Sequence, residues 1–202
     1  MRVRPRLLPV LALLAGLSAC GGGAGISYYL IDAEPGPVLR SGSPLSVEII
    51  DLDVPQYLER VQLATRSSAN QLDYASTHQW GEPLRKTLAR VLAEHLATVL
   101  STADVATPHH RLSSRPELRL QVHVDRFERG VDGRVELRGR FQLTDAADGR
   151  VLATERVDVD GGPRIADGDY SALVASMQAR YAEFAQRIAR AVAAHAPAEP
   201  AS

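Results

Sequence analysis

The chain has 202 residues, of which 45% are hydrophobic and 23% are charged, enough for one globular domain with its own core. Without the three arginines among the first 19 residues, 20 basic residues face 24 acidic ones, and this net charge of −4 argues against nucleic acid or anionic headgroups as the main partners. A single cysteine excludes disulfide bonds within the chain and metal sites built from several cysteines.

Residues 1–19 have the features of a cleaved signal peptide. Three arginines precede the apolar run Leu7–Leu17, whose 11 residues are too few for a helix that spans a bilayer. The run ends in Leu-Ser-Ala-Cys, the kind of sequence at which bacterial lipoproteins are cleaved and acylated. We therefore predict that Cys20 is the lipidation site and that its acyl chains hold the mature protein at a membrane. The alternative is an ordinary signal peptide that leaves Cys20 as a free thiol.

The residue after the cysteine bears on which membrane holds the protein. It is Gly21, whereas an aspartate there favours retention at the inner membrane under the usual Gram-negative sorting rule. We therefore predict a lipid anchor in the outer membrane, with the domain on its periplasmic face. The glycine-rich residues 20–26 are expected to form a flexible tether. Residues 195–202, rich in alanine and proline, are expected to form a disordered tail, which leaves residues 27–194 as one domain.

The first half of this domain shows the two-residue alternation of half-buried strands. Leu45, Val47 and Ile49 alternate with polar residues, and Val61 and Leu63 repeat the pattern. Strands are predicted at residues 27–31, 45–49, 61–65 and 71–76.

Two helices are predicted from apolar residues at helical spacing. Pro83 begins the first helix, because a proline in the first turn needs no N–H donor. Its apolar stripe consists of Leu84, Leu88, Val91, Leu92, Leu96 and Val99. The second helix covers residues 170–194, with Asp169 as its N-cap. Its stripe consists of Leu173, Met177, Tyr181, Phe184, Ile188 and Val192.

Between the helices lies the most regular strand pattern of the chain. After a polar loop at residues 106–116, apolar and polar residues alternate from Leu118 to Asp125, and Asp132-Gly133 and Asp148-Gly149 mark turns. These turns separate a return strand at residues 135–143 from a third strand at residues 151–159, an antiparallel meander with one buried face. The expected fold class is α+β: a single domain with a largely antiparallel sheet and two amphipathic helices packed on one face.

An ordered set of short motifs resembles the ABC-type transport auxiliary lipoproteins, most closely the outer-membrane lipoprotein of the paraquat-inducible (Pqi) system. The motifs read DVPQYLER at 53–60, VQLATR at 61–66, NQL at 70–72, WGEPL at 80–84 and RVL at 90–92. The residues that carry the resemblance are Pro55, Tyr57, Leu58, Arg60, Thr65, Arg66, Asn70, Trp80, Glu82, Pro83 and Arg90. The chain departs from the family pattern at Glu59, Gln79 and Gly81, where aspartate, arginine and alanine are usual.

This resemblance implies a compact α/β domain that is a non-catalytic subunit of a lipid transport system. The implied partner is a periplasmic MCE-domain protein of the Pqi type (PqiB-like), which the lipoprotein docks at the outer membrane. The second contact is the outer-membrane bilayer itself, through the acyl chains of Cys20. A homo-oligomeric ring that matches the symmetry of the MCE protein is a further implication.

Alternatives to this reading remain at several residues. Trp80 either packs over the start of the helix or anchors a partner, and Arg60 and Arg66 either pair with carboxylates such as Asp53 or Asp73 or contact a partner. Neither a nucleophile motif nor metal-ligand spacing is found, so we expect no enzyme activity, no cofactor and no metal. The adjacent histidines 109 and 110 are expected in a solvated loop.

A different function class also remains open, that of a lipid-binding carrier. The stripe of the final helix contains Met177, Tyr181 and Phe184, side chains that could cradle an acyl chain. The commoner use of such a stripe is to fill a core. Aromatic residues make up only 5% of the chain, which does not favour a large apolar cavity. His95 is expected to be half-buried, and His123 to lie on the polar face of its strand.

Overall fold

A computed structural model describes residues 25–40, 45–110 and 115–196 of the chain. Cys20 and most of the predicted leader and tether lie outside these described residues. The strands are β1 (Ser27–Tyr29), β2 (Val47–Asp53), β3 (Gln62–Ser68), β4 (Gln71–Trp80), β5 (Val105–Ala106), β6 (Leu118–Arg129), β7 (Val135–Asp145) and β8 (Val151–Val159). The helices are the short 3-10 helix η1 (Gln56–Leu58) and the α-helices α2 (Leu84–Val99) and α3 (Tyr170–His195).

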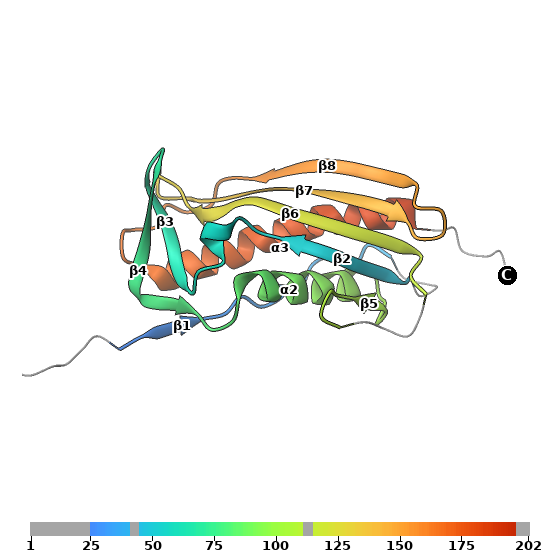
Figure 1. Cartoon of the computed structure of the whole chain (residues 1–202), viewed down its shortest axis with the longest axis horizontal. Helices are drawn as coiled ribbons and strands as arrows, with labels where there is room; N and C mark the ends of the chain where they lie inside the picture. The colour runs from blue at the N-terminus through green and yellow to red at the C-terminus, as the bar shows by residue number, and fades with distance from the viewer. Residues whose placement is uncertain (1–24, 41–44, 111–114, 197–202) are drawn as a thin grey trace, which may run out of the picture.

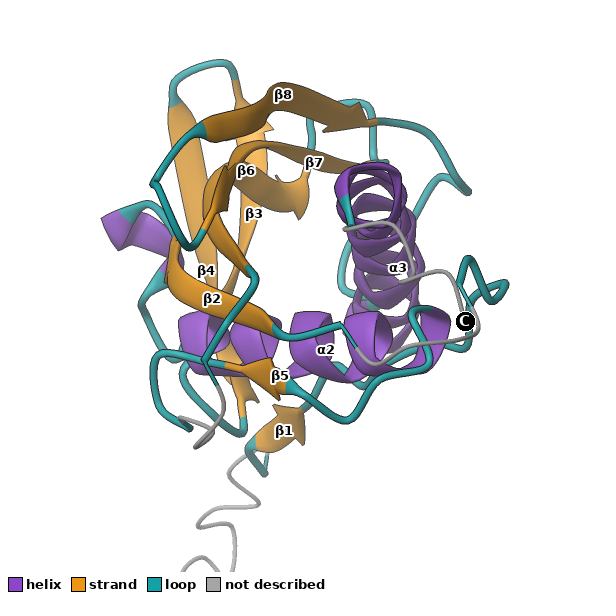
Figure 2. Cartoon of the chain, turned by 90° about the vertical axis from the view of Figure 1, so that its right-hand side faces the viewer, coloured by secondary structure: helices purple, strands orange, loops and turns teal. Residues whose placement is uncertain are grey.

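The eight described strands form one mixed sheet, which curves around two α-helices (Figure 2). Strands β6, β7 and β8 make the predicted antiparallel meander, and β3 and β4 form an antiparallel hairpin. On the other edge of β6, β2 pairs in parallel with its first half, and β3 joins its last residue. The short strands β1 and β5 add parallel pairs to β4 and β2. These parallel pairings were not predicted, because they join segments far apart in the sequence.

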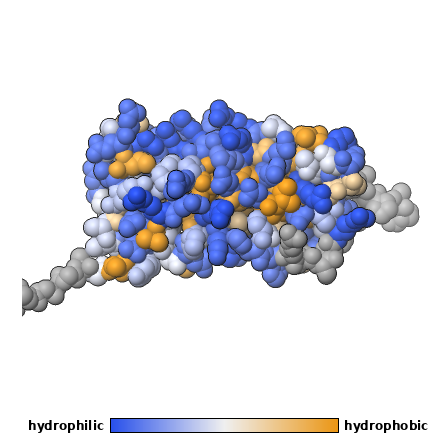
Figure 3. Space-filling view, viewed as in Figure 1, coloured by the Kyte–Doolittle hydropathy of each residue, from blue (hydrophilic) through white to orange (hydrophobic). Residues whose placement is uncertain are grey.

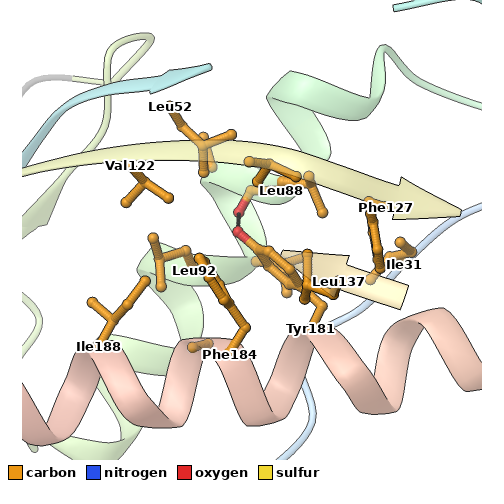
Figure 4. Packing of buried hydrophobic residues seen from close by; sticks show 14 of the residues in the cluster. Ile31, Leu52, Leu88, Leu92, Val122, Phe127, Leu137, Tyr181, Phe184 and Ile188 are labelled. Atoms are coloured by element: carbon orange, nitrogen blue, oxygen red, sulfur yellow. Dashed lines mark hydrogen bonds between the residues drawn. The ribbon is translucent and has the colours of Figure 1, made fainter. Parts of the chain in front are cut away.

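Both α-helices cover the same face of the sheet, as predicted (Figures 1 and 2). Helix α3 contacts β6, β7 and β8, whereas α2 contacts β2 and β5, and the two helices touch each other. Every residue of the two predicted stripes is buried. The hydroxyl of Tyr181 donates a hydrogen bond of 2.7 Å to the carbonyl oxygen of Leu88 and so joins the helices inside the core (Figure 4). Met177, Tyr181 and Phe184 therefore fill the core and form no acyl-chain cradle.

Phe184 of α3 packs on a position of the sheet where only glycine fits. At Gly139 of β7, an added Cβ would lie 2.8 Å from the carbonyl oxygen of His123 and 3.0 Å from the ring of Phe184. The side chain of an alanine would therefore collide with backbone on one side and with a buried ring on the other. The glycine lets the helix approach the centre of the meander.

The N-terminal segment after β1 packs over the helices. Ile31 is fully buried, and the backbone N–H of Leu39 donates to the carbonyl oxygen of Val99 at 2.7 Å. His95 lies beneath this segment, with its ring nitrogens 3.1 Å from the carbonyl oxygen of Glu34 and 2.9 Å from Oε1 of Gln186. His95 is only 3% exposed, so the expectation of a half-buried side chain was wrong. The cover comes from the N-terminal segment, which helical periodicity does not reveal.

Several boundaries differ from those predicted. Strand β4 continues beyond Ser76 to Trp80, because β1 and β3 pair with it on both sides. Helix α3 ends at His195, one residue later than predicted. The side chain of Asp169 accepts a hydrogen bond of 3.0 Å from the N–H of Ala172, which confirms the predicted N-cap. Pro83 lies directly before the first helical residue instead of within the first turn.

Candidate functional site

Two residues of the family motifs meet a fully buried carboxylate at one corner of the sheet. Arg66 of β3 donates from Nε to Oε1 of Glu128 at 3.0 Å, and its Nη2 lies 2.9 Å from the same oxygen. The hydroxyl of Tyr57, in η1, donates to Oε2 of Glu128 at 2.6 Å, and the backbone N–H of Phe127 donates to the same oxygen at 3.1 Å. Because Glu128 has no exposed surface, these donors replace the water that a carboxylate otherwise requires.

Around this corner, Tyr74 of β4 contacts two further groups of motif residues, those of Tyr57 and Arg60. The hydroxyl of Tyr74 reaches the carbonyl oxygen of Tyr57 at 3.4 Å, and the guanidinium of Arg60 lies 4.7 Å from the centre of the Tyr74 ring. Arg60 thus makes a cation–π contact, whereas Arg66 makes an ion pair. Neither arginine pairs with Asp53 or Asp73, the two carboxylates that the sequence offered.

Further charges extend the corner along β6 and β7. Arg126 lies 3.5 Å from Glu128 through Nε and donates from Nη1 to Glu136 at 2.6 Å. The hydrogen bond to Glu136 raises the pKa of Arg126, partly offset by desolvation. Arg138 lies 3.4 Å from the same oxygen of Glu136. One network thus contains two carboxylates and three arginines: Glu128 and Glu136 with Arg66, Arg126 and Arg138.

This network fastens a chain crossover. Residues 54–61 connect β2 to β3 through η1. Tyr57, within this connection, and Arg66, just beyond it in β3, both bind Glu128 of β6. The sequence analysis missed Glu128. Its signal was the break in alternation after Val124: a β-bulge between Val124 and Arg126 shifts the pattern, so that Phe127 faces the helices and Glu128 faces the opposite side of the sheet, where Tyr57 and Arg66 bury it.

The buried tyrosines predict how the stability responds to alkaline pH. Burial raises the pKa of Tyr181 above its ordinary value of 10.0. The pKa of Tyr57 is also raised above its ordinary value, first by burial and second by the hydrogen bond to Glu128. A phenol with a raised folded pKa stays protonated while the unfolded chain begins to ionise. Its contribution to stability is therefore complete below the unfolded pKa and is lost as the pH rises above it.

We therefore expect the free energy of unfolding to fall above pH ~10 by about 1.4 kcal/mol per pH unit for each buried tyrosine. Urea unfolding across this range should show a shallower fall for Tyr181→Phe than for the wild type. Tyr28→Phe, on the exposed side of β1, is the matched control and should keep the wild-type slope. An unchanged slope in Tyr181→Phe would contradict the assignment.

The remaining motif residues also serve the fold. Leu58 and Trp80 are buried, and the backbone N–H of Trp80 donates to the carbonyl oxygen of Val61 at 2.7 Å. Trp80 thus packs in the core ahead of α2 and is not an exposed anchor. Oε2 of Glu82 accepts from the Thr87 hydroxyl at 3.4 Å, in the first turn of the helix.

Four motif residues lie nearer the surface. Arg90 bridges α2 and the N-terminal segment, donating to Glu94 at 3.1 Å and to the carbonyl oxygen of Ile31 at 3.3 Å. Asn70 lies in the exposed two-residue turn between β3 and β4, and Pro55 precedes η1. Thr65 pairs with Arg129 at the end of β6. The motif set therefore marks a structural corner and a helix start.

Two surface cavities differ in their lining. A polar cleft of about 390 Å³ lies where β3 and β6 end beside the start of α3, and its rim carries an ion pair between Arg129 and Asp167. Ser67 and Asp73 line it, but its lining residues include neither a histidine nor a cysteine. Among these described residues, no hydrogen bond joins Ser67 to Asp73, so the serine is not paired with a base.

A second cavity, of about 440 Å³, lies between α2 and residues 105–110. Ala89, Ala93 and Val105 line it together with His109 and His110. Within the described part of the chain, no three histidine, cysteine, aspartate or glutamate side chains are placed to hold a metal ion. Elsewhere, His123 lies on the outer sheet face as predicted, 3.1 Å from Asp53 and 3.3 Å from Asp125.

The predicted lipidation site lies outside the described residues and stays a prediction. The described chain begins at Gly25, five residues after Cys20. Among the described helices, none is both long and apolar enough to cross a bilayer.

Comparison with known proteins places these features in a family. The model of the family described as "ABC-type transport auxiliary lipoprotein component" matches residues 28–189, most of the chain. A crystal structure from Xanthomonas campestris has a TM-score of 0.69 and 15% identity, and the similarity covers 81% of this chain and 92% of that one. Another crystal structure, of an uncharacterized protein, has a TM-score of 0.65 and 24% identity over 83% and 99% of the two chains. Both support the fold alone. No curated protein matches the sequence.

Proposed function

This chain belongs to the ABC-type transport auxiliary lipoprotein family, and we propose that it is a non-catalytic subunit that docks a periplasmic MCE-domain protein at the outer membrane. Cys20 would carry the acyl chains, and the folded domain would face the periplasm. The transported compound would then be a lipid, passed along the MCE protein.

One observation carries this proposal: a lipoprotein cleavage sequence ending at Cys20 stands directly before a domain that matches the family over residues 28–189. The geometry of the domain adds support. Tyr57, Arg60 and Arg66 are engaged in holding a chain crossover, and the polar cleft lacks a nucleophile–base pair. A role in binding and positioning needs no such pair.

The mechanism is one of placement. Several acyl chains give stable attachment to the inner leaflet of the outer membrane, where a single chain would give only reversible binding. The glycine-rich residues 21–25 give the domain freedom to orient, within a short distance of the bilayer. Several copies arranged as a ring would match an MCE protein of cyclic symmetry, because a symmetric partner offers the same surface to each copy.

The test compares the wild type with Cys20→Ala in the native host. We expect wild-type protein in outer-membrane fractions to crosslink to the MCE-domain protein, and Cys20→Ala to be recovered in the soluble periplasmic fraction without that crosslink. The melting temperature of the released domain should equal that of wild-type domain detached from its acyl chains, because the described core begins at Ile31. Wild-type protein found in the membrane but never crosslinked would contradict the docking role.

A role as a lipid-binding carrier is the second candidate, and one observation favours it. The cavity between α2 and residues 105–110 has an apolar floor at Ala89, Ala93 and Val105. Its volume of about 440 Å³ lies toward the small end of ligand pockets. Mass spectrometry of the Cys20→Ala domain under native conditions distinguishes the two functions. A stoichiometric bound phospholipid supports the carrier, and a protein free of lipid supports docking.

A further inference from the structure

Three apolar side chains lie exposed at the N-terminal corner of the sheet. Tyr28, in the centre of β1, is 65% exposed, and Ile26 and Leu30 on either side of the strand are 50% and 49% exposed. Because side chains alternate along a strand, these three project to the same side, opposite to Tyr29. We call Ile26, Tyr28 and Leu30 the β1 patch. In Figure 3, hydrophobic colour marks the lower left corner, where β1 lies in Figure 1.

The sheet neighbours of the β1 patch are uncharged. Tyr28 pairs with Gln79 of β4, and Gln79 in turn pairs with Gln62 of β3. Leu30 lies against Gly81, where an added Cβ would be 3.1 Å from its side chain. The charged residues Asp32 and Glu82 lie at the edge of the patch and are exposed to water. Burial of the neutral centre costs less than burial of an ion.

The outer face of the meander is different, although it belongs to the same sheet. It carries a lattice of ion pairs, in which Asp125 lies 3.1 Å from Arg140, 3.3 Å from His123 and 3.8 Å from Arg156. The other exposed apolar side chains of the described residues stand on different elements: Val38, Ile50, Val61, Val131 and Val151. The β1 patch thus combines apolar side chains at successive outward positions with uncharged sheet neighbours.

Strand β1 is held rigidly in place. The hydroxyl of Tyr29 lies 2.8 Å from Nδ1 of His78, whose ring stacks on Tyr170 at a centroid distance of 4.2 Å. The N–H of Gly81 donates to the carbonyl oxygen of Tyr29 at 2.8 Å. Because β1 is fixed to the rest of the domain by these contacts, a surface that binds the β1 patch also sets the orientation of the whole domain.

The covalent chain limits how far this patch can lie from the lipid anchor. Ile26 comes only six positions after Cys20, and a fully extended chain over six residue steps spans about 20 Å. We propose that the β1 patch is a membrane contact, inserted among the lipid headgroups and upper acyl chains beside the anchor. This deepens the proposed function, since it rests on the domain being tethered at a bilayer through Cys20. Tyrosine favours this interfacial zone because its ring is apolar and its hydroxyl polar.

A membrane contact here would convert a loose tether into a defined orientation. The acyl chains supply attachment, and the β1 patch fixes which side of the domain faces the lipid. The start of β8, which carries the exposed Val151, and the charged meander face would then be set for a periplasmic partner. Each half-exposed side chain that enters the interface should strengthen membrane partitioning roughly three- to tenfold.

The test uses residues 21–202 with an N-terminal histidine tag that replaces the acyl chains. Vesicles of phosphatidylethanolamine and phosphatidylglycerol with a nickel-chelating lipid hold this protein by its tag. Because Cys20 is the only cysteine, Gln79→Cys places a single environment-sensitive dye beside Tyr28 without altering the β1 patch. Val151→Cys, at a site 52% exposed on β8, is the matched control.

We expect the dye at residue 79 to shift its emission to shorter wavelength on vesicles and to be quenched by brominated acyl chains, while the dye at residue 151 does neither. Replacing Ile26, Tyr28 and Leu30 with serine should abolish the shift and the quenching although the tag still holds the protein. Equal signals at residues 79 and 151 would overturn the proposal. So would a shift without vesicles that grows with protein concentration, because it would assign the patch to a second copy. Acylation of Cys20, measured separately by mass spectrometry, does not affect this outcome.

Discussion

Replacing Glu128 with alanine is expected to destabilise the domain by about 3 kcal/mol, because the substitution leaves Arg66 and Tyr57 without their shared acceptor. The estimate lies at the lower end for a broken buried ion pair, since the Arg66 side chain keeps 13% of its surface exposed and regains some water. Urea unfolding of the purified domain measures the change as a shift in midpoint at constant slope.

Two variants separate the buried carboxylate from its exposed neighbours. Glu128→Gln keeps an acceptor for one donor and should cost less than Glu128→Ala. Glu136→Ala removes the partner of Arg126 where the side chain is 21% exposed, and should cost less than about 1 kcal/mol. If Glu128→Ala proved no more harmful than Glu136→Ala, Glu128 would not be the centre of the corner.

Phe184→Ala is expected to cost about 3–5 kcal/mol, because it removes a fully buried ring between the final helix and the meander. The loss should appear in calorimetry as a lower melting temperature, with the helix content retained. Tyr181 stacks beside this ring at a centroid distance of 6.0 Å, and Phe127 packs on Tyr181 in turn (Figure 4), so the surroundings are too crowded to close the cavity fully.

A double-mutant cycle with Gly139→Ala tests the cause. Gly139→Ala alone should destabilise by about 1–3 kcal/mol through overpacking. In the Phe184→Ala background its cost should be smaller, because one of the two collisions has gone while the contact with the His123 carbonyl remains. Strict additivity of the two substitutions would show that Phe184 does not restrict residue 139.

The family motifs acquire a physical meaning from these contacts. Arg60 and Arg66 were open between pairing with carboxylates inside the domain and contacting a partner. In the structure both are used with Tyr57 at the corner around Glu128, and Trp80 is used in the core. The motifs therefore identify the family through the requirements of its fold. A surface for a protein partner is better sought on exposed regions such as the outer face of the meander.

The sequence by itself determined the local elements and the two helix faces. The alternation from Leu118 to Val124 and the stripes of α2 and α3 were sufficient, because each pattern reports burial within a few consecutive residues. The α+β class followed from the order of these elements, and the leader and Cys20 supplied an expected anchor independently of the fold.

Only the tertiary structure decided which distant segments meet. The parallel pairing of β2 with β6, and the choice of Glu128 as acceptor for Arg66 from 62 residues away, have no local signature. The physical reason is that such pairings are selected by the packing of the whole chain. The sequence alone offers several carboxylates that could form an ion pair with the arginine, and it does not distinguish between them. The β-bulge after Val124 then turned Glu128 to the outer face of the sheet, where Tyr57 and Arg66 lie, and that one-residue shift selected it.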